Sequence, residues 1–189
     1  MRNVTPAAES VPDAARSRRF EEQVLPHLGA AYGLARWLAR ADDDAEDVLQ
    51  EAMLRAFRYY NDRGDGNTRA WLLTIVRNTF YTLRKQSPAT LQDEFDEAMH
   101  GSADDIATPE MQLLREADIR QLRDAIESLP LEFREVLVLR EFEQCSYKDI
   151  AEITGLKLGT VMSRLARARD RLAQYLGAGA RGEEHHVVQ

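Results

Sequence analysis

The chain has 189 residues, 44% of them hydrophobic and 30% charged, with 10 glycines and 6 prolines. This length suits one domain or two small ones, and the composition is that of a folded, helix-favouring protein, which excludes disorder of the whole chain. The formal net charge of −7 argues at first sight against a nucleic-acid partner, because phosphate binding usually requires a basic excess. We expect a cytoplasmic protein, since neither a secretory signal nor a membrane span can be recognised.

The acidic excess lies in the middle of the chain. Residues 1–90 carry 13 basic and 12 acidic side chains, residues 129–189 carry 9 of each, and residues 91–128 carry 3 basic and 11 acidic ones. Because the two ends are close to neutral, each can present a basic face of its own. The charge of the whole chain therefore does not exclude binding to DNA.

The predicted elements begin with a flexible leader over residues 1–17, which show no sustained periodicity. From Phe20 to about Arg40, apolar residues recur at three- and four-residue spacing. This spacing predicts a helix that Pro26 breaks or kinks near its start.

Two further helices are predicted before residue 87. The acidic run 42–44 would cap the first of them, which extends to about Tyr60. Residues 61–67 are dense in turn formers and predict a loop. The next helix would be capped by Asn67 or Thr68 and ended by Pro88, which cannot continue it.

Basic and aromatic residues alternate along this third helix. Arg69 and Arg77 are expected near its surface, and aromatic side chains such as Trp71 occur between them. Aromatic and basic groups beside a polar loop suit single-stranded nucleic acid. A place in the core is the plainer interpretation of Trp71.

Residues 87–108 are rich in acids and poor in apolar residues, which predicts a linker. A linker of this length favours two domains, over residues 18–86 and 109–177, with a flexible tail over 178–189. About 22 linker residues at about 3.3 Å each reach on the order of 70 Å, which is about two turns of DNA. The two domains could therefore contact sites along one face of a duplex.

Four helices are predicted in the second domain. Pro109 is well placed to start the first, which ends before Pro130. The others are expected at about 131–142, 146–154 and 158–176. The predicted fold class is thus all-α, with two small helical domains.

The sharpest local pattern is that of a helix-turn-helix. Ser146 and Asp149 form the pattern of a capping box. Ala151 is small where two helices would cross, Gly155 allows a sharp turn, and Val161 can anchor the following helix.

The helix after the turn carries Arg164, Arg167, Arg169 and Arg171, with Lys157 just before it. Such a helix can lie in the major groove, with its first residues toward the base edges. A solvated charged face, common on surface helices, is the alternative.

Several blocks of the sequence resemble the sigma-70 family, in its extracytoplasmic-function branch. The matching blocks occur in order along residues 18–177 and comprise 44–51 (DAEDVLQE), 69–72 (RAWL), 77–78 (RN), 129–136 (LPLEFREV), 146–151 (SYKDIA) and 159–169 (GTVMSRLARAR). The resemblance implies two helical domains, called region 2 and region 4. It also implies an initiation factor that directs core RNA polymerase to promoters.

The resemblance further implies partners and site residues. The partners would be the clamp helices and flap of core RNA polymerase, promoter DNA and an anti-sigma factor. The residues that match the clamp-binding stretch are Asp44, Asp47, Leu49, Gln50 and Glu51. Those that match contacts to the −10 element, including an extruded base, are Arg55, Asn61, Asp62, Arg63 and Asn78. Those that match the stretch facing the −35 element are Lys157, Thr160, Met162, Ser163, Arg164, Ala166 and Arg167.

The sequence departs from the family at two of these positions. The family often has a basic residue in place of Met162 and a larger one in place of Ala166. We therefore expect fewer, or apolar, base contacts there.

Two other classes of function compete with this interpretation. One is a stand-alone helix-turn-helix regulator whose first domain senses a ligand or dimerises. The other is a nucleic-acid enzyme, but we find neither a metal-ligand cluster, nor a nucleophile with a base, nor a glycine loop for phosphate. We therefore predict no catalytic residues, no metal and no cofactor.

Overall fold

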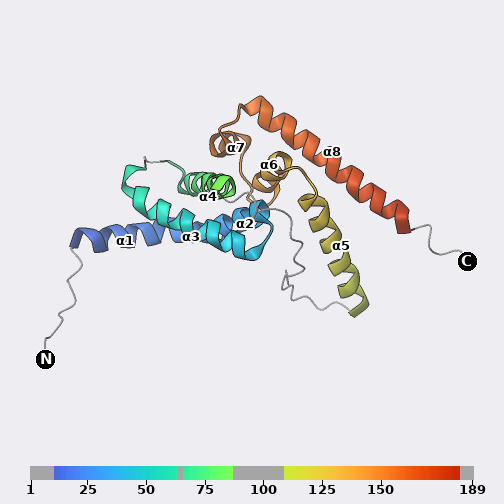
Figure 1. Ribbon diagram of the computed structural model, residues 1–189, viewed down its shortest axis with the longest axis horizontal. Helices are drawn as coiled ribbons and strands as arrows, with labels where there is room; N and C mark the ends of the chain where they lie inside the picture. Colours follow the sequence, from blue (N-terminus) through green and yellow to red (C-terminus); the bar gives the residue numbers. More distant parts are fainter. Residues whose placement is uncertain (1–10, 64–65, 87–108, 184–189) are drawn as a thin grey trace, which may run out of the picture.

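The computed structural model describes residues 11–63, 66–86 and 109–183, which form helices joined by short connections (Figure 1). The predicted linker 87–108, the first residues of the predicted leader and residues 184–189 of the predicted tail lie outside the described residues. Within the described ranges the regular elements are helices, without strands. The predicted all-α class is therefore confirmed.

The first half of the chain forms a helical bundle. Its elements are α1 (Val11–Val24), the 3-10 helix η1 (Leu25–His27), α2 (Leu28–Ala39), α3 (Asp42–Tyr59), the 3-10 helix η2 (Tyr60–Asp62) and α4 (Thr68–Gln86). Pro26 lies inside η1, which separates α1 from α2, so the predicted break is confirmed. The helices α2, α3 and α4 pack against one another.

The second half contains α5 (Pro109–Glu127), α6 (Leu131–Glu141), α7 (Tyr147–Thr154) and α8 (Leu158–Glu183). The start of α7 and the turn between α7 and α8 have the predicted chemistry. Ser146 Oγ accepts the Asp149 N–H at 3.1 Å, and Asp149 Oδ2 accepts the Ser146 N–H at 3.0 Å. Gly155 ends α7 in the left-handed conformation, with φ at 69°, where a side chain is disfavoured. The helix-turn-helix prediction is confirmed.

The helix ends differ from the prediction in two places. Helix α1 begins at Val11, so residues 11–17 are helical rather than part of a leader. A tertiary contact stabilises this turn, because the Arg16 guanidinium donates to the Phe57 carbonyl at 2.6 Å and lies 4.7 Å from the Phe57 ring centroid. Helix α8 continues to Glu183, since a glycine such as Gly177 costs only about 1 kcal/mol in a helix.

The predicted cap of α3 is wrong. Its N-cap is Ala41, which makes no side-chain cap hydrogen bond, and the acids 42–44 lie in the first helical turn. There they interact favourably with the helix dipole, and Asp42 forms an ion pair with Arg36. The cap of α4 is Asn67, whose Oδ1 accepts the N–H groups of Arg69 at 3.0 Å and Ala70 at 3.2 Å.

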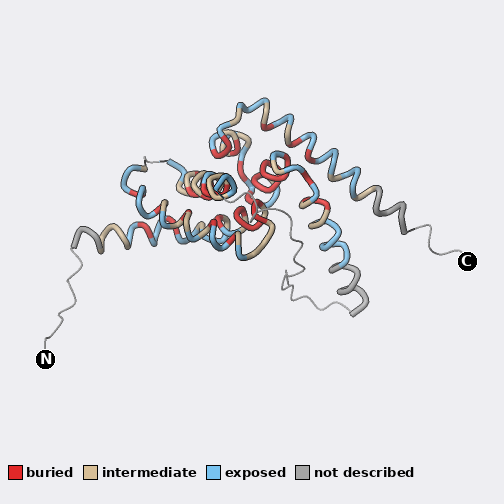
Figure 2. The backbone as a smooth tube through the Cα atoms, in the orientation of Figure 1, coloured by how far each residue is buried: buried red, intermediate tan, exposed pale blue. Residues whose placement is uncertain are grey.

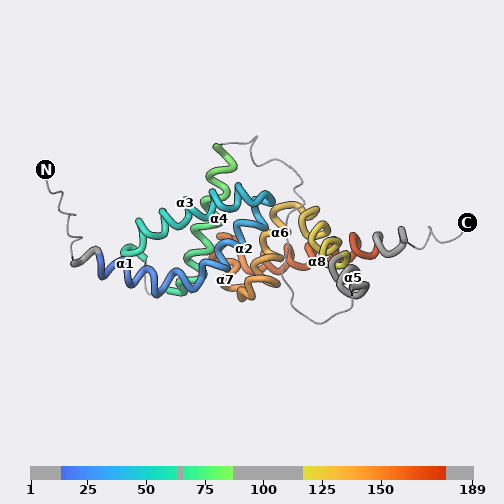
Figure 3. The backbone as a smooth tube through the Cα atoms, turned by 90° about the horizontal axis from the view of Figure 1, so that it is seen from below, coloured from blue at the N-terminus to red at the C-terminus, as the bar shows by residue number. Residues whose placement is uncertain are grey.

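The two halves of the chain share one hydrophobic core. Helix α4 packs against α7 and α2 packs against α6, and the views in Figures 1 and 3 both place these helices side by side. Buried residues gather where they meet (Figure 2). The shared cluster includes Leu34, Leu72 and Val76 from the first half, and Leu139, Ile150, Ile153 and Val161 from the second.

Candidate nucleic-acid interface

Helix α3 presents an acidic face. Asp47 and Gln50 are exposed, Asp44 and Glu51 are half-buried, and Leu49 packs against the core. Partial burial raises the pKa of Asp44, and the neighbouring acids Asp47 and Asp43 add to this. The acids on this face form a local concentration of negative charge, which suits a basic protein partner.

The residues predicted to contact the −10 element lie on three consecutive elements. Arg55 is on α3, where it forms an ion pair with Glu51 at 2.7 Å. Asn61 and Asp62 are exposed in η2, and Asn78 is exposed on α4. Helices α3 and α4 pack directly against each other, so one rigid bundle supports the set.

Arg63 is held by partners within the bundle. Its guanidinium donates to Thr68 Oγ1 at 2.7 Å and to Gln23 Oε1 at 2.5 Å. It also lies 5.4 Å from the Tyr60 ring centroid and 5.8 Å from that of Trp71. These contacts tie η2 to α1 and α4, which orients the neighbouring polar residues.

Trp71 packs against the core and is half-buried. The structure therefore supports a core role for this side chain. The stacking platform that the sequence also allowed would need an exposed ring.

The first turns of α8 present an open face. Lys157, Ser163, Ala166 and Arg167 are exposed, and Met162 is 52% exposed. The opposite side is anchored by three buried residues, Val161, Leu165 and Ala168. The helix thus has a buried stripe and an outward face with a methionine, small side chains and basic groups.

Thr160 and three of the predicted α8 arginines are partly engaged within the protein. Thr160 is half-buried, and Arg164 lies 3.2 Å from the Glu132 carboxylate. Arg169 forms an ion pair with Glu141 at 2.6 Å, and the Arg171 guanidinium lies 4.9 Å from the Phe133 ring centroid. The predicted arginine run therefore divides between the surface and contacts with α6.

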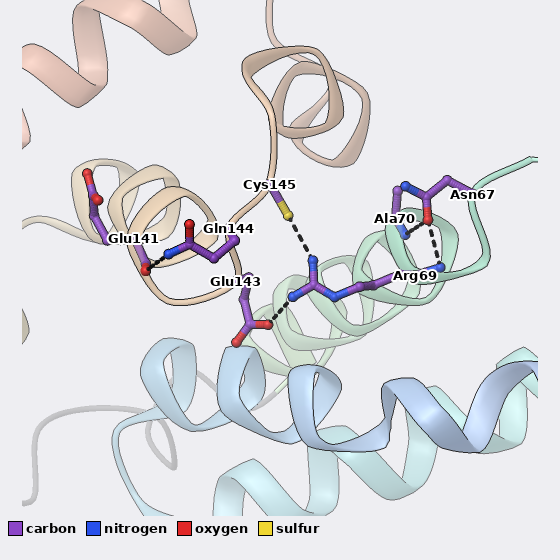
Figure 4. Close-up of polar contacts among 7 residues, drawn as sticks. All are labelled: Asn67, Arg69, Ala70, Glu141, Glu143, Gln144 and Cys145. Carbon is purple, nitrogen blue, oxygen red and sulfur yellow. Dashed lines mark hydrogen bonds and ion pairs between the residues drawn. The ribbon is translucent and has the colours of Figure 1, made fainter.

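The positions of two arginines of α4 differ from the prediction. Arg69 and Arg77 were expected near the surface, but both contact the second half of the chain. Arg69 Nη2 lies 2.5 Å from Glu143 Oε2, and its Nη1 donates to the Cys145 sulfur at 3.5 Å (Figure 4). Arg77 Nε lies 2.7 Å from Glu135 Oε1.

The two acids in these pairs have perturbed pKa values. Burial raises the pKa of Glu135, and the attraction of Arg77 only partly offsets this effect. Burial likewise raises the pKa of Glu143, against the opposing influence of Arg69. Neither pairing has a local sequence signal, because the partners are far apart in the chain.

Among the described residues, His, Cys, Asp and Glu do not form a group of three or more that could hold a metal ion. Across the same residues, the helices are too short or too polar to cross a membrane.

The two halves match two family models in the expected order. Residues 24–88 match the model described as Sigma-70 region 2, and residues 119–172 match that described as Sigma-70, region 4. The helix-turn-helix and the open face of α8 both lie within the second match. The chain belongs to the sigma-70 family, in its extracytoplasmic-function (ECF) branch.

Individual relatives support this assignment. The chain is 32% identical over 173 residues to the ECF RNA polymerase sigma factor SigE of Mycolicibacterium smegmatis, covering 91% of this chain and 67% of that protein. It is 36% identical over 168 residues to the RNA polymerase sigma-H factor of Pseudomonas aeruginosa, with coverages of 84% and 86%. The structure resembles that of the sigma factor RpoE from Bartonella quintana, solved with the anti-sigma factor NepR. That match has a TM-score of 0.70 and 29% identity, and covers 85% of this chain and 98% of the other.

Proposed function

We propose that the protein is a transcription initiation factor that binds core RNA polymerase and directs it to specific promoters. The observation that supports this conclusion is the presence of regions 2 and 4 in one chain, together with the open face of α8. The protein would act by binding and positioning, without covalent chemistry of its own. It would work in the cytoplasm, where its polymerase and DNA partners are found.

Region 2 is assigned to the polymerase and the −10 element. The acidic face of α3 would dock on the clamp helices through Asp44, Asp47, Leu49, Gln50 and Glu51. The −10 contacts would come from Arg55, Asn61, Asp62, Arg63 and Asn78. Extruding a base from the stack costs a few kcal/mol, so a preformed site on a rigid bundle is favourable. The contacts of Arg63 with Thr68 and Gln23 support such rigidity.

Region 4 is assigned to the −35 element. The α8 helix is of a size that enters the major groove, and its exposed face would contact bases and phosphates through Lys157, Thr160, Met162, Ser163, Arg164, Ala166 and Arg167. Met162 offers an apolar surface, which suits contact with a thymine methyl group. Arg167 can contact phosphate or a base edge.

We further propose two domains joined by the acidic linker 87–108, and regulation by an anti-sigma factor. The linker is long enough to allow both promoter elements to be reached at once. The regulatory partner is supported by the Bartonella relative, whose structure was solved with an anti-sigma factor.

Reconstituted transcription tests the proposed function. Purified chain plus core RNA polymerase should give run-off transcripts from promoters mapped genome-wide with the same holoenzyme, and neither component alone should do so. Asn78→Ala should impair promoter melting, and Arg167→Ala should impair promoter binding. Lys148→Ala, at an exposed position on α7, is the matched control and should leave the transcript yield unchanged. Tight sequence-specific duplex binding without polymerase, and no transcription with it, would favour the stand-alone regulator.

A further inference from the structure

Helix α8, which lies along one edge of the molecule (Figure 1), begins with an exposed row of apolar side chains. Leu158 is 50% exposed and Met162 is 52% exposed, and Ala166 is exposed one turn further along. Residues four apart lie on the same side of a helix, so these three side chains form one apolar strip. A single exposed apolar residue is ordinary on a protein surface, whereas three in register provide a surface for an apolar contact.

The polar side chains beside the apolar strip are partly engaged within the protein. Ser163 Oγ donates to the Thr160 carbonyl at 3.0 Å, and the Thr160 side chain is half-buried. Arg164 lies 3.2 Å from the Glu132 carboxylate. Hydrogen bonds from these side chains to an outside partner would compete with their internal contacts, whereas the apolar strip is already exposed to a partner.

The charges around the strip indicate what kind of partner it contacts. Lys157 directly precedes the strip and Arg167 directly follows it, and both are exposed. Asp170 is exposed one turn further on, where it would repel a phosphate. A polyanion is therefore attracted between Lys157 and Arg167. The apolar group that duplex DNA presents in its major groove is the 5-methyl group of thymine.

Gly159, between Lys157 and the rest of the helix, supplies an independent observation. A Cβ added there would meet no other atom within 4 Å, so packing within the protein does not require a glycine. Glycine in a helix costs about 0.5–1 kcal/mol relative to alanine. A residue without a side chain allows the helix backbone to approach a ligand closely, which places the partner at the first turn of α8.

We propose that Leu158 and Met162 determine the specificity of the −35 contact by packing on thymine methyl groups. Gly159 lets the first turn of α8 enter the groove deeply enough for this contact, and Lys157 and Arg167 hold the flanking phosphates. Leu158 and Met162 are about 6 Å apart along the helix axis, or about two base steps of about 3.4 Å. The inference rests on the proposed function, because it takes α8 to be the helix that contacts the −35 element.

Removing single methyl groups from the DNA tests the inference. Holoenzyme made from the full chain and core RNA polymerase is bound to a promoter that it transcribes. Each thymine of the −35 element, on either strand, is replaced in turn by deoxyuridine, which lacks only the methyl group. We expect the affinity to fall about fourfold at each contacted thymine, which is the effect of withdrawing one methyl group from an apolar contact.

Variants of the strip assign each methyl group to a side chain. Leu158→Ala and Met162→Ala should each abolish the discrimination between thymine and uracil at one position, and Met162→Leu should preserve it. Met162→Arg should shift the preferred base toward guanine, whose O6 and N7 accept from arginine. The matched control is Lys157→Ala, which should weaken binding to the thymine and uracil promoters equally, because a phosphate contact does not depend on the methyl group.

The glycine gives a measurement with two readouts of opposite sign. Gly159→Ala should raise the urea midpoint of the free chain, because alanine favours the helix. The same substitution should weaken promoter binding by the holoenzyme severalfold, because its methyl group stands between the helix backbone and the DNA. Unchanged promoter binding by Gly159→Ala would overturn the close approach of this turn.

The results separate this inference from the proposed function. Equal affinity for the thymine and uracil promoters overturns the contact with methyl groups, as does a −35 element without A·T pairs. Discrimination that persists in both alanine variants also overturns it. In these cases the transcripts still support the initiation factor. A chain that gives no transcript with core polymerase refutes the proposed function, and the inference falls with it.

Discussion

Helices α4 and α8 both carry arginines, but the surroundings of these side chains differ between the two helices. On α8, Arg167 is exposed and Lys157 is exposed just before the helix, beside small side chains. On α4, Arg69 and Arg77 are each paired with a buried glutamate of the other half. A basic helix face is therefore not by itself an accessible one, since accessibility depends on what packs against it.

Removing one partner of the more deeply buried ion pair, Arg77–Glu135, should cause the largest loss of stability. Arg77→Ala leaves the carboxylate of Glu135 buried without its ion-pair partner, so we expect a loss of about 3 kcal/mol from the packed state. Urea titration followed by tryptophan fluorescence measures this loss, because Trp37 lies at the contact between the halves. The control is Arg84→Ala, at an exposed position on the same helix. Equal midpoints for the two variants would contradict a stabilising role of the Arg77–Glu135 pair.

The same change on α8 should affect DNA binding and not stability. Arg167 is exposed, so Arg167→Ala should leave the urea midpoint within about 0.5 kcal/mol of the wild type. If Arg167 contacts a phosphate, the salt dependence of holoenzyme binding to a promoter should fall by about one unit of slope. Binding measured at several salt concentrations checks this. An unchanged slope together with altered base preference would instead place Arg167 on a base edge.

The pH dependence of the free energy of unfolding should differ between a variant of the buried acid Glu135 and a variant of an exposed acid. Burial raises the pKa of Glu135 in the folded protein above its ordinary value of 4.5. The packed state therefore gains stability from this group below pH 4.5, and loses it as the pH rises through the raised value. Glu135→Gln removes this titration, so its stability relative to the wild type should increase over the same interval.

Urea midpoints of Glu135→Gln and the wild type, measured between about pH 4 and pH 7, test whether the variant gains relative stability as the pH rises. The control is Glu132→Gln, at an exposed position on the same helix. A difference between Glu135→Gln and the wild type that does not vary with pH would contradict the raised pKa.

The smallest expected effect concerns the space beside Glu143. Alanine in a helix interior is more stable than glycine by about 0.5–1 kcal/mol, but at Gly33 the new Cβ would crowd the Glu143 carboxylate. We expect Gly33→Ala to be close to neutral in the wild type and stabilising in a Glu143→Ala background. A double-mutant cycle measures this coupling, and strict additivity would show that the two residues do not compete for space.

The capping box at Ser146, the left-handed turn at Gly155 and the buried stripe of α8 were all predictable, because each depends on residues within a few positions of one another. The same holds for the break at Pro26 and for the family, which short ordered blocks identify. Local periodicity also placed most helices close to their observed bounds.

Only the tertiary structure shows which charged side chains form ion pairs. Arg69 and Glu143 are 74 residues apart, and Arg77 and Glu135 are 58 apart, so local spacing contains no information about their pairing. The early start of α1 likewise depends on the contact of Arg16 with Phe57, a residue of another helix. Sequence patterns specify which side of a helix is apolar. The packing of α4 on α7 and of α2 on α6 determines which of the remaining, polar helix faces are covered. Burial and ion pairing arise only when distant segments come together.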